Sequence, residues 1–238
     1  NIPRICFINK MDKLGADFFA TVTDIKEKFG VNPAIMVLPM GAENDFRGVI
    51  QILEQKALFW KDNAADTEPE VMAIPEEYKE KVAELRSALI EQIAETDDVL
   101  LQKYFDGEEI SLNDLKKALR KAVIGYKLVP VYARSSLKNT GVQPMLDAVV
   151  DYLPSPVDID HITGINPKTK EEETRKLIPN ERFCALAFKI QTDPHVGKIT
   201  YTRVYSGILK AGSYIYNSST KQKERIGRLL LMHANERE

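Results

Sequence analysis

Short apolar runs separated by amphipathic stretches make up most of the first 155 residues. The runs at Arg4–Asn9 and Leu128–Ala133 predict strands that are buried on both faces, as in a parallel sheet. Ala34–Met40 predicts one further strand of the same kind. Two more runs are predicted to pair as a hairpin, Phe46–Ile52 and Lys56–Trp60.

Apolar residues at helical spacing predict helices between these strands. The strongest begins after Pro75, where glutamates cover the face opposite an apolar stripe. The stripe consists of Tyr78, Val82, Leu85, Leu89 and Ile93. The other helices are predicted at Asp17–Phe29, Asp98–Phe105, Asn113–Ile124 and Val142–Leu153. In the last helix, Leu146, Val149, Val150 and Leu153 lie on one side. Strands alternating with helices predict an α/β fold.

The pattern changes after Pro179. Phe183–Gln191 and Ile199–Tyr205 alternate in side-chain character and are separated by Gly and Pro turns, which predicts a β barrel or sandwich. Asp158–Pro179 is long and polar, so we place a domain boundary there. The expected organisation is a first domain over residues 1–157, a linker over 158–180 and a β domain over 181–238.

Composition narrows the class of protein. The chain has 238 residues, of which 44% are hydrophobic and 29% charged, so wholesale disorder is excluded. A net charge of −2 excludes a generally basic nucleic-acid coat. The two cysteines lie far apart, which fits a reducing cytoplasm better than a disulfide scaffold. No apolar run approaches the roughly 18–20 residues that span a membrane. Because the first residue is Asn1, we expect a piece of a longer protein.

The small net charge conceals two opposite segments. Asp66–Glu109 holds 14 acidic and 4 basic side chains, a net charge of −10. Arg182–Glu238 holds 10 basic and 4 acidic side chains, a net charge of +6. Such a difference indicates separate partners for the two segments. The charge counts alone favour a solvated acidic helix beside an ordinary basic β domain.

The clearest candidate for chemistry is Asn9-Lys10-Met11-Asp12, directly after a predicted buried strand. Ligands of open α/β sheets bind at the carboxyl ends of the strands. An aspartate there accepts hydrogen bonds from the ring N–H and the exocyclic amine of guanine, a donor pair that adenine lacks. We expect Asn9 and the stem of Lys10 to support the loop and cover the base.

A second loop follows the strand predicted at Leu128–Ala133. Its residues Ser135, Ser136 and Leu137 are placed to offer backbone N–H groups to a purine carbonyl oxygen. The alternative is a plain strand-to-helix connection whose serines cap the helix. The three histidines, His161, His195 and His233, show no metal-binding spacing, so no metal site is predicted.

Three stretches resemble bacterial-type translation elongation factor G: NKMD, LVPVYARSSLKNTGVQPMLDAVVDYLPSP and TDPHVGKITYTRVYSGILKAGSYIYNSSTKQKERIGRLLLMHANERE. The resemblance covers essentially the whole chain. It implies an α/β partial P-loop GTPase domain with an inserted α+β subdomain at about 31–125, followed by part of an all-β translation-factor barrel. Residues that match the guanine-specificity motif are Asn9, Lys10 and Asp12. Residues that match the second guanine loop are Ser135, Ser136 and Leu137, with Arg134 in place of a glycine.

The resemblance also implies partners. In the family, the acidic helix of the insert faces the ribosomal stalk protein, and the matching residues here are Glu76, Glu77, Glu80, Glu84 and Glu91. The barrel rests on small-subunit ribosomal RNA, and the candidate contacts are Lys221, Lys223, Arg225 and Arg228. The full-length family protein binds GTP or GDP with Mg²⁺ in the cytoplasm. It moves tRNA and mRNA through the ribosome.

Several family parts have no counterpart in this sequence. It contains no Gly-x-x-x-x-Gly-Lys-Ser/Thr phosphate loop, no switch segment with a Mg²⁺-binding threonine and no Asp-x-x-Gly followed by histidine. We therefore expect no catalytic residue, no bound nucleotide and no GTP hydrolysis by this chain alone. We also expect an exposed sheet edge that pairs non-physiologically with a second copy.

Two other interpretations remain open. The first is a self-standing, non-catalytic adaptor that binds stalk protein and RNA. The second is a related translational GTPase, such as a ribosomal protection protein. The close match through Asp193–Glu238 argues against the second interpretation.

Overall fold

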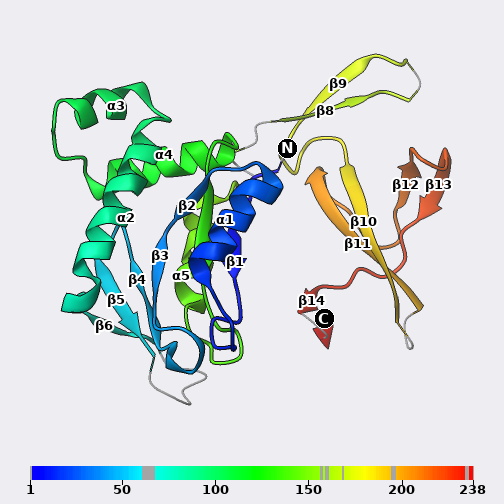
Figure 1. Cartoon of the computed structure of the whole chain (residues 1–238). Coiled ribbons are helices and arrows are strands. Elements are labelled where there is room, and N and C mark those ends of the chain that lie inside the picture. Colours follow the sequence, from blue (N-terminus) through cyan, green and yellow to red (C-terminus); the bar gives the residue numbers. More distant parts are fainter. Residues whose placement is uncertain are drawn as a thin grey trace. The chain divides into compact units, whose positions relative to one another are not determined.

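The structure is a computed structural model that describes residues 2–60, 68–155, 158, 161–167, 169–193, 197–233 and 236–237. His195 and part of the segment predicted as a linker lie outside these residues. The chain forms two compact units, Asn1–Leu153 and Pro154–Glu238, shown in Figure 1. Each unit is described by itself.

A three-stranded parallel sheet lies at the centre of the first unit (Figure 1). Its strand order is β1 (Cys6–Ile8), β7 (Val129–Ala133) and β2 (Pro33–Ile35). All five residues of β7 are buried, which confirms the prediction of a strand covered on both faces. Within the described residues β1 pairs with β7 alone, so β1 is an edge strand.

Helix α1 (Phe18–Phe29) connects β1 to β2 and has defined ends. The Asp17 side chain accepts a hydrogen bond of 2.9 Å from the Ala20 amide, which satisfies a free donor of the first turn. Gly30 ends the helix in the left-handed region. The predicted helix is therefore confirmed, and its apolar side packs into the core.

The rest of the first unit is an antiparallel sheet, three helices that follow it in the chain and a last helix described below. The sheet order is β3 (Val37–Met40), β4 (Gly48–Gln51), β5 (Lys56–Phe59) and β6 (Glu70–Met72). The helices are α2 (Glu76–Ala94), α3 (Asp98–Phe105) and α4 (Leu112–Ile124). The hairpin of β4 and β5 and all three helices agree with the sequence-based predictions, and Ser111 caps α4.

The prediction of a single strand at Ala34–Met40 is wrong, because this run contributes strands to two sheets. β2 pairs with β7 in the parallel sheet, whereas β3 pairs with β4 in the antiparallel sheet. Met36 joins them: its amide donates to Val131 at 3.1 Å, and its carbonyl accepts from Ile52 at 3.0 Å. The run is apolar throughout because both halves are buried, so periodicity cannot reveal the change of partner.

Helix α5 (Val142–Tyr152) confirms the predicted helix, and it packs with a side other than the one that gathers Leu146, Val149 and Val150. The buried residues are Pro144, Met145, Ala148 and Tyr152. Leu146, Val149 and Val150 are exposed. Apolar residues occur on more than one side of this helix, so spacing alone does not identify the side that packs.

The second unit consists of antiparallel hairpins (Figure 1). The pairs are β8 (His161–Ile165) with β9 (Glu172–Lys176), β10 (Cys184–Asp193) with β11 (Gly197–Ser206), β12 (Tyr214–Asn217) with β13 (Gln222–Arg225), and β14 (Met232–His233) with β15 (Glu236–Arg237). The segment 158–180, expected as a linker, therefore holds the hairpin of β8 and β9. Every residue of strand β9 is polar, so it lacks the apolar alternation from which strands are predicted.

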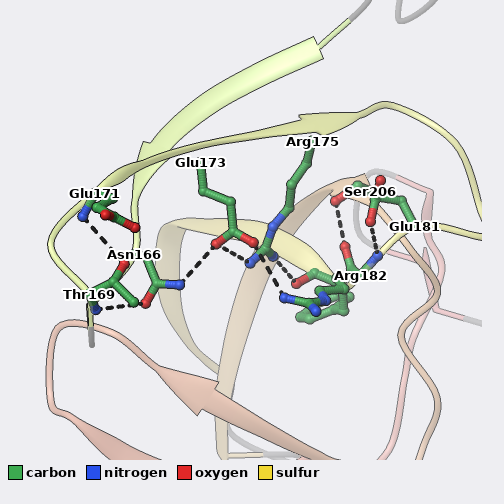
Figure 2. Close-up of polar contacts among 9 residues, drawn as sticks. Asn166, Thr169, Glu171, Glu173, Arg175, Glu181, Arg182 and Ser206 are labelled. Atoms are coloured by element: carbon green, nitrogen blue, oxygen red, sulfur yellow. Dashed lines mark hydrogen bonds and ion pairs between the residues drawn. The ribbon is translucent and has the colours of Figure 1, made fainter.

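Polar contacts around Glu173 connect that hairpin to the start of β10 (Figure 2). The Glu173 carboxylate accepts from Asn166 at 3.3 Å and pairs with Arg175 at 3.5 Å and Arg182 at 3.3 Å. Arg175 also donates to the Phe183 carbonyl oxygen at 3.0 Å. One carboxylate thus orders residues from three segments of the second unit.

The core of the first unit makes a stability prediction. Leu119 of α4 is fully buried, whereas Leu112 on the same helix is 41% exposed. We expect Leu119→Ala to lower the free energy of unfolding by about 3 kcal/mol, and Leu112→Ala by less than about 1 kcal/mol, because only the first leaves a cavity. Urea unfolding followed by the fluorescence of Trp60, the single tryptophan, measures both. Equal losses would contradict the packing described.

Candidate functional site

The two loops identified in the sequence leave the sheet side by side. β1 and β7 run parallel with Ile8 opposite Ala133, so the loops that follow them emerge at the same sheet edge. Two backbone bonds continue this pairing: the Arg134 amide donates to Ile8 at 2.9 Å, and the Met11 amide donates to the Arg134 carbonyl oxygen at 3.3 Å. The structure therefore brings together residues more than 120 positions apart.

Asn9 forms the side-chain connection between the loops. Its Oδ1 atom accepts hydrogen bonds from the Ser136 amide at 3.1 Å and from the Ser136 hydroxyl at 2.9 Å. The neighbouring Lys10 is exposed and has a left-handed φ of 65°. Asn9 therefore fixes the spacing between the loops, while the Lys10 side chain extends into solvent.

Asp12 is the buried acceptor of the first loop, with 7% of the residue exposed. Its Oδ2 atom pairs with Lys13 at 3.4 Å, whereas its buried Oδ1 atom has no hydrogen-bond partner among the described residues. A hydrogen bond from the Ser135 side chain, then the backbone amide of Asp12 itself and Lys13, hold the pKa of the Asp12 carboxyl below its ordinary value, although burial opposes them. The carboxylate is therefore ionised at neutral pH and keeps acceptor capacity for a ligand.

The second loop is closed by a short backbone bridge. The Ser135 amide donates to Thr140 at 2.9 Å, and the Thr140 amide donates back at 3.0 Å. Gly141 follows with φ of 76°, and an added Cβ there would lie 2.5 Å from the Ala133 carbonyl oxygen. Gly141 is also the N-cap of α5, so neither serine of the loop caps this helix.

The tip of this loop points away from the protein. Leu137 is 79% exposed, and the amide of Lys138 is engaged by the Ser135 hydroxyl at 3.3 Å. Arg134, which replaces a family glycine, has no positive φ, and its guanidinium lies 5.1 Å from the centre of the Phe7 ring. The arginine therefore fits without the conformation that would require glycine.

Sequence reasoning missed Glu43, which contacts the loop that carries Asp12. The Glu43 amide donates to Met11 at 2.8 Å, and its carboxylate accepts from the Gly15 amide at 2.7 Å. A cavity of about 230 Å³ lies at this loop, lined in part by Asn9 and Lys10. No sequence spacing connects Glu43 with residues about 30 positions earlier.

The five glutamates predicted on α2 are all exposed along this helix. Three of them pair with basic side chains: Glu76 with Lys79 at 2.5 Å, Glu84 with Lys81 at 2.8 Å and Glu77 with Arg47 at 3.7 Å. These exposed pairs are weak in water. The face therefore remains predominantly acidic.

The four basic residues predicted to meet RNA are exposed on and beside β13. The register of β12 and β13 places Tyr216 opposite Lys223 and Tyr214 opposite Arg225. Directly opposite residues share a face of an antiparallel pair, so two exposed tyrosines lie beside two cations. The tyrosines were not predicted as site residues, although alternation along Tyr214–Asn217 was a usable indication.

A second cavity of the first unit lies among other residues. It measures about 340 Å³, and its lining includes Glu54, Lys116, Tyr132 and Tyr152. Burial tends to lower the pKa of Lys116, but the bond from Lys116 to Glu54 and the charge of Asp151 outweigh it and raise the pKa. Lys116 is thus a charged partner of these carboxylates.

Among the described residues, no group of three or more His, Cys, Asp or Glu side chains is placed to hold a metal ion. In the same part of the chain, no helix combines the length and the apolar character needed to cross a membrane.

Comparisons with known proteins establish the class. Residues 1–155 match the family model for the elongation factor Tu GTP binding domain, and residues 197–238 match that for elongation factor Tu domain 2. The chain therefore belongs to the family of the elongation factor Tu GTP binding domain. This match supports the predicted α/β GTPase-type domain followed by a β-rich domain.

Particular relatives narrow the comparison. The chain is 52% identical over 237 residues to elongation factor G of Aquifex pyrophilus, which covers 100% of the chain and 34% of that protein. It also resembles a Thermus thermophilus protein of known crystal structure, with 28% identity and a TM-score of 0.75 over 99% of this chain and 32% of that one. The chain spans about a third of the length of these relatives. The resemblance to elongation factor G noted in the sequence is confirmed.

The lowered pKa of Asp12 makes a pH prediction. A carboxyl whose pKa is lower in the folded state stabilises the fold above its unfolded pKa of about 3.9, and this contribution is lost as the pH falls through the folded pKa. We therefore expect Asp12→Asn to lower stability most at neutral pH, with a difference from wild type that shrinks below about pH 4. Urea unfolding from pH 7 to pH 3 measures this difference. The control is Asp24→Asn on the exposed side of α1, for which we expect a smaller loss; equal behaviour would contradict the environment described for Asp12.

Proposed function

We propose that this chain supplies the base-recognising part of the guanine-nucleotide site of an elongation factor G-type translational GTPase. In full length, that protein would use GTP with Mg²⁺ to move tRNA and mRNA on the ribosome. The observation that carries the proposal is the buried Oδ1 atom of Asp12, which has no hydrogen-bond partner among the described residues. It lies in the first of the two loops that Asn9 and Ser136 join. Membership of the GTP binding domain family supports it.

Asp12 selects guanine by complementarity of donors and acceptors. Its ionised carboxylate accepts from the ring N–H and the exocyclic amine of guanine. Adenine presents a ring nitrogen with a lone pair at the corresponding position, so a buried carboxylate would meet an acceptor. The amide of Ser136 already donates to Asn9, which leaves the amide of Leu137 at the exposed tip to meet the purine carbonyl oxygen.

Base contacts alone supply too little affinity to retain a nucleotide. Phosphoryl transfer depends mainly on residues that position the phosphates and the metal ion. The sequence contains no phosphate loop, and no described cluster of His, Cys, Asp or Glu fits a Mg²⁺ ion. We therefore assign no Mg²⁺ ligand and no hydrolytic step to this chain.

We further propose two macromolecular contacts. The exposed glutamates of α2 would face a basic surface of the ribosomal stalk protein, which the net charge of −10 over Asp66–Glu109 favours. The face of β12 and β13 that carries Lys223, Arg225 and their tyrosine neighbours would contact ribosomal RNA. Cations bind phosphates, and the aromatic rings offer surfaces on which bases stack.

The isolated chain provides a first test. We expect calorimetric titration of the 238-residue chain with GDP to show no saturable binding up to millimolar nucleotide, because the phosphate contacts are missing. ADP serves as the control for unspecific heat. Saturable binding that is selective for GDP would contradict the incomplete site and would favour a self-standing nucleotide-binding module.

A second test uses the full-length protein, of which we propose this chain is a part. We expect Asp12→Asn to weaken GDP binding at least roughly tenfold, because the amide removes one acceptor that discrimination requires. The same variant should favour xanthosine diphosphate, which presents a carbonyl oxygen where guanine has its amine. Competition binding with both nucleotides measures the preference. Asp24→Asn should leave it unchanged, and an Asp12→Asn protein that still prefers GDP would disprove the role of Asp12.

A further inference from the structure

The loop from Lys10 to Gly15 has little support from its own residues. Two turn bonds shape it, from the Lys13 amide to Lys10 at 3.0 Å and from the Ala16 amide to Lys13 at 3.1 Å. Lys13, Leu14 and Gly15 are exposed. Because Asp12 lies within this loop, the direction of its carboxylate depends on contacts from elsewhere in the first unit.

Glu43 provides such contacts at both ends of the loop. Its amide donates to the carbonyl oxygen of Met11 at 2.8 Å, and its Oε1 atom accepts from the Gly15 amide at 2.7 Å. Glu43 adopts a left-handed φ of 55°, which is unfavourable for a glutamate. These two bonds stabilise the conformation, and they bracket Asp12 on its two sides in the sequence.

The segment that carries Glu43 is itself held in place. Gly41 has φ of 77°, and an added Cβ would lie 2.2 Å from the Asp45 carbonyl oxygen, so only glycine fits. The Gly41 amide donates to the hydroxyl of Tyr78 on α2 at 3.2 Å. Phe46 at the other end is buried in the core. Glu43 is therefore presented by a constrained turn rather than by a free loop.

We propose that Glu43 is a positioning residue for the loop that carries Asp12, and that Tyr78 connects this support to helix α2. The contacts run from Tyr78 to Gly41, through the turn to Glu43, and from Glu43 to Met11 and Gly15. Tyr78 belongs to the apolar stripe of α2 and packs against the core, on the side of the helix opposite the exposed glutamates. A partner that displaces this helix would thereby be coupled to the orientation of Asp12.

The loop contacts exist without any ligand, so the first experiment uses the nucleotide-free 238-residue chain. Amide hydrogen exchange by NMR reports the Gly15 N–H directly. We expect Glu43→Ala to accelerate exchange of this amide roughly tenfold, because the accepting carboxylate is removed. Glu43→Gln retains an accepting oxygen and should stay within about twofold of wild type. The matched control is Asn44→Ala, the exposed neighbour, which should also stay within that range.

The positions at which amide hydrogen exchange accelerates decide whether Glu43 positions the loop. Acceleration confined to the Lys10–Gly15 loop, with rescue by Glu43→Gln, supports the positioning role. Equal acceleration of the amides of β7 would mean global destabilisation and would overturn it, as would an unchanged Gly15 amide in Glu43→Ala. Tyr78→Phe should accelerate the Gly41 amide and, by roughly threefold, the Gly15 amide. An unchanged Gly15 amide in Tyr78→Phe would overturn the connection to α2.

The consequence for nucleotide rests on the proposed function and is measured separately. In the full-length protein, Glu43→Ala should weaken GDP binding roughly tenfold, and Glu43→Gln should restore it. If the unmodified full-length protein fails to bind GDP, the proposed function fails while the exchange results still decide the role of Glu43. If it binds GDP and Glu43→Ala has no effect, the positioning role in recognition is overturned.

Discussion

The parallel pairing of β1 with β7 is the constraint on which the candidate site depends. Ile8 lies opposite Ala133, so the chain leaves both strands at the same edge and at the same height. The hydrogen bond from the Ser136 amide to Asn9 requires this register, because it forms only when the two loops lie side by side. A shift by one residue would turn the side chains to the other face and would separate the two loops. The sheet register thus determines the geometry of the candidate site.

Most elements of the first unit could be predicted because their burial leaves a simple pattern in the sequence, either a continuous apolar run or an apolar stripe at helical spacing. The strand at β7 and the stripe of α2 are examples, since each contacts the core along its whole length. What could not be predicted has a different cause. Met36 changes sheets without a change in polarity, and α5 has apolar residues on an uncovered side. Periodicity reports which residues avoid water, but it does not report which partner covers them.

Site prediction had a similar limit. Asn9 and Asp12 were recognised because they follow a buried strand in a loop of four residues. Glu43 was not recognised as a site candidate. Its proposed positioning role depends on a left-handed backbone conformation and on a side chain that reaches Gly15, 28 positions away. Such a contact has neither a period nor a characteristic composition. The tyrosines beside Lys223 and Arg225 likewise become site candidates only when the register of β12 and β13 is known.

The unpartnered oxygen of Asp12 explains why the surrounding loops are held so firmly. A buried acceptor without a hydrogen bond costs about 1–3 kcal/mol, which favours turning that oxygen towards water, whereas the contacts of Ser135 and Lys13 favour the ionised carboxylate where it is. The contacts made by Asn9, Ser135 and Glu43 oppose that movement. The acceptor therefore stays directed, and a ligand that donates to it would recover the cost on binding. The unpartnered oxygen limits stability at this end of the sheet, and the contacts that hold it keep it available to a ligand with matching donors.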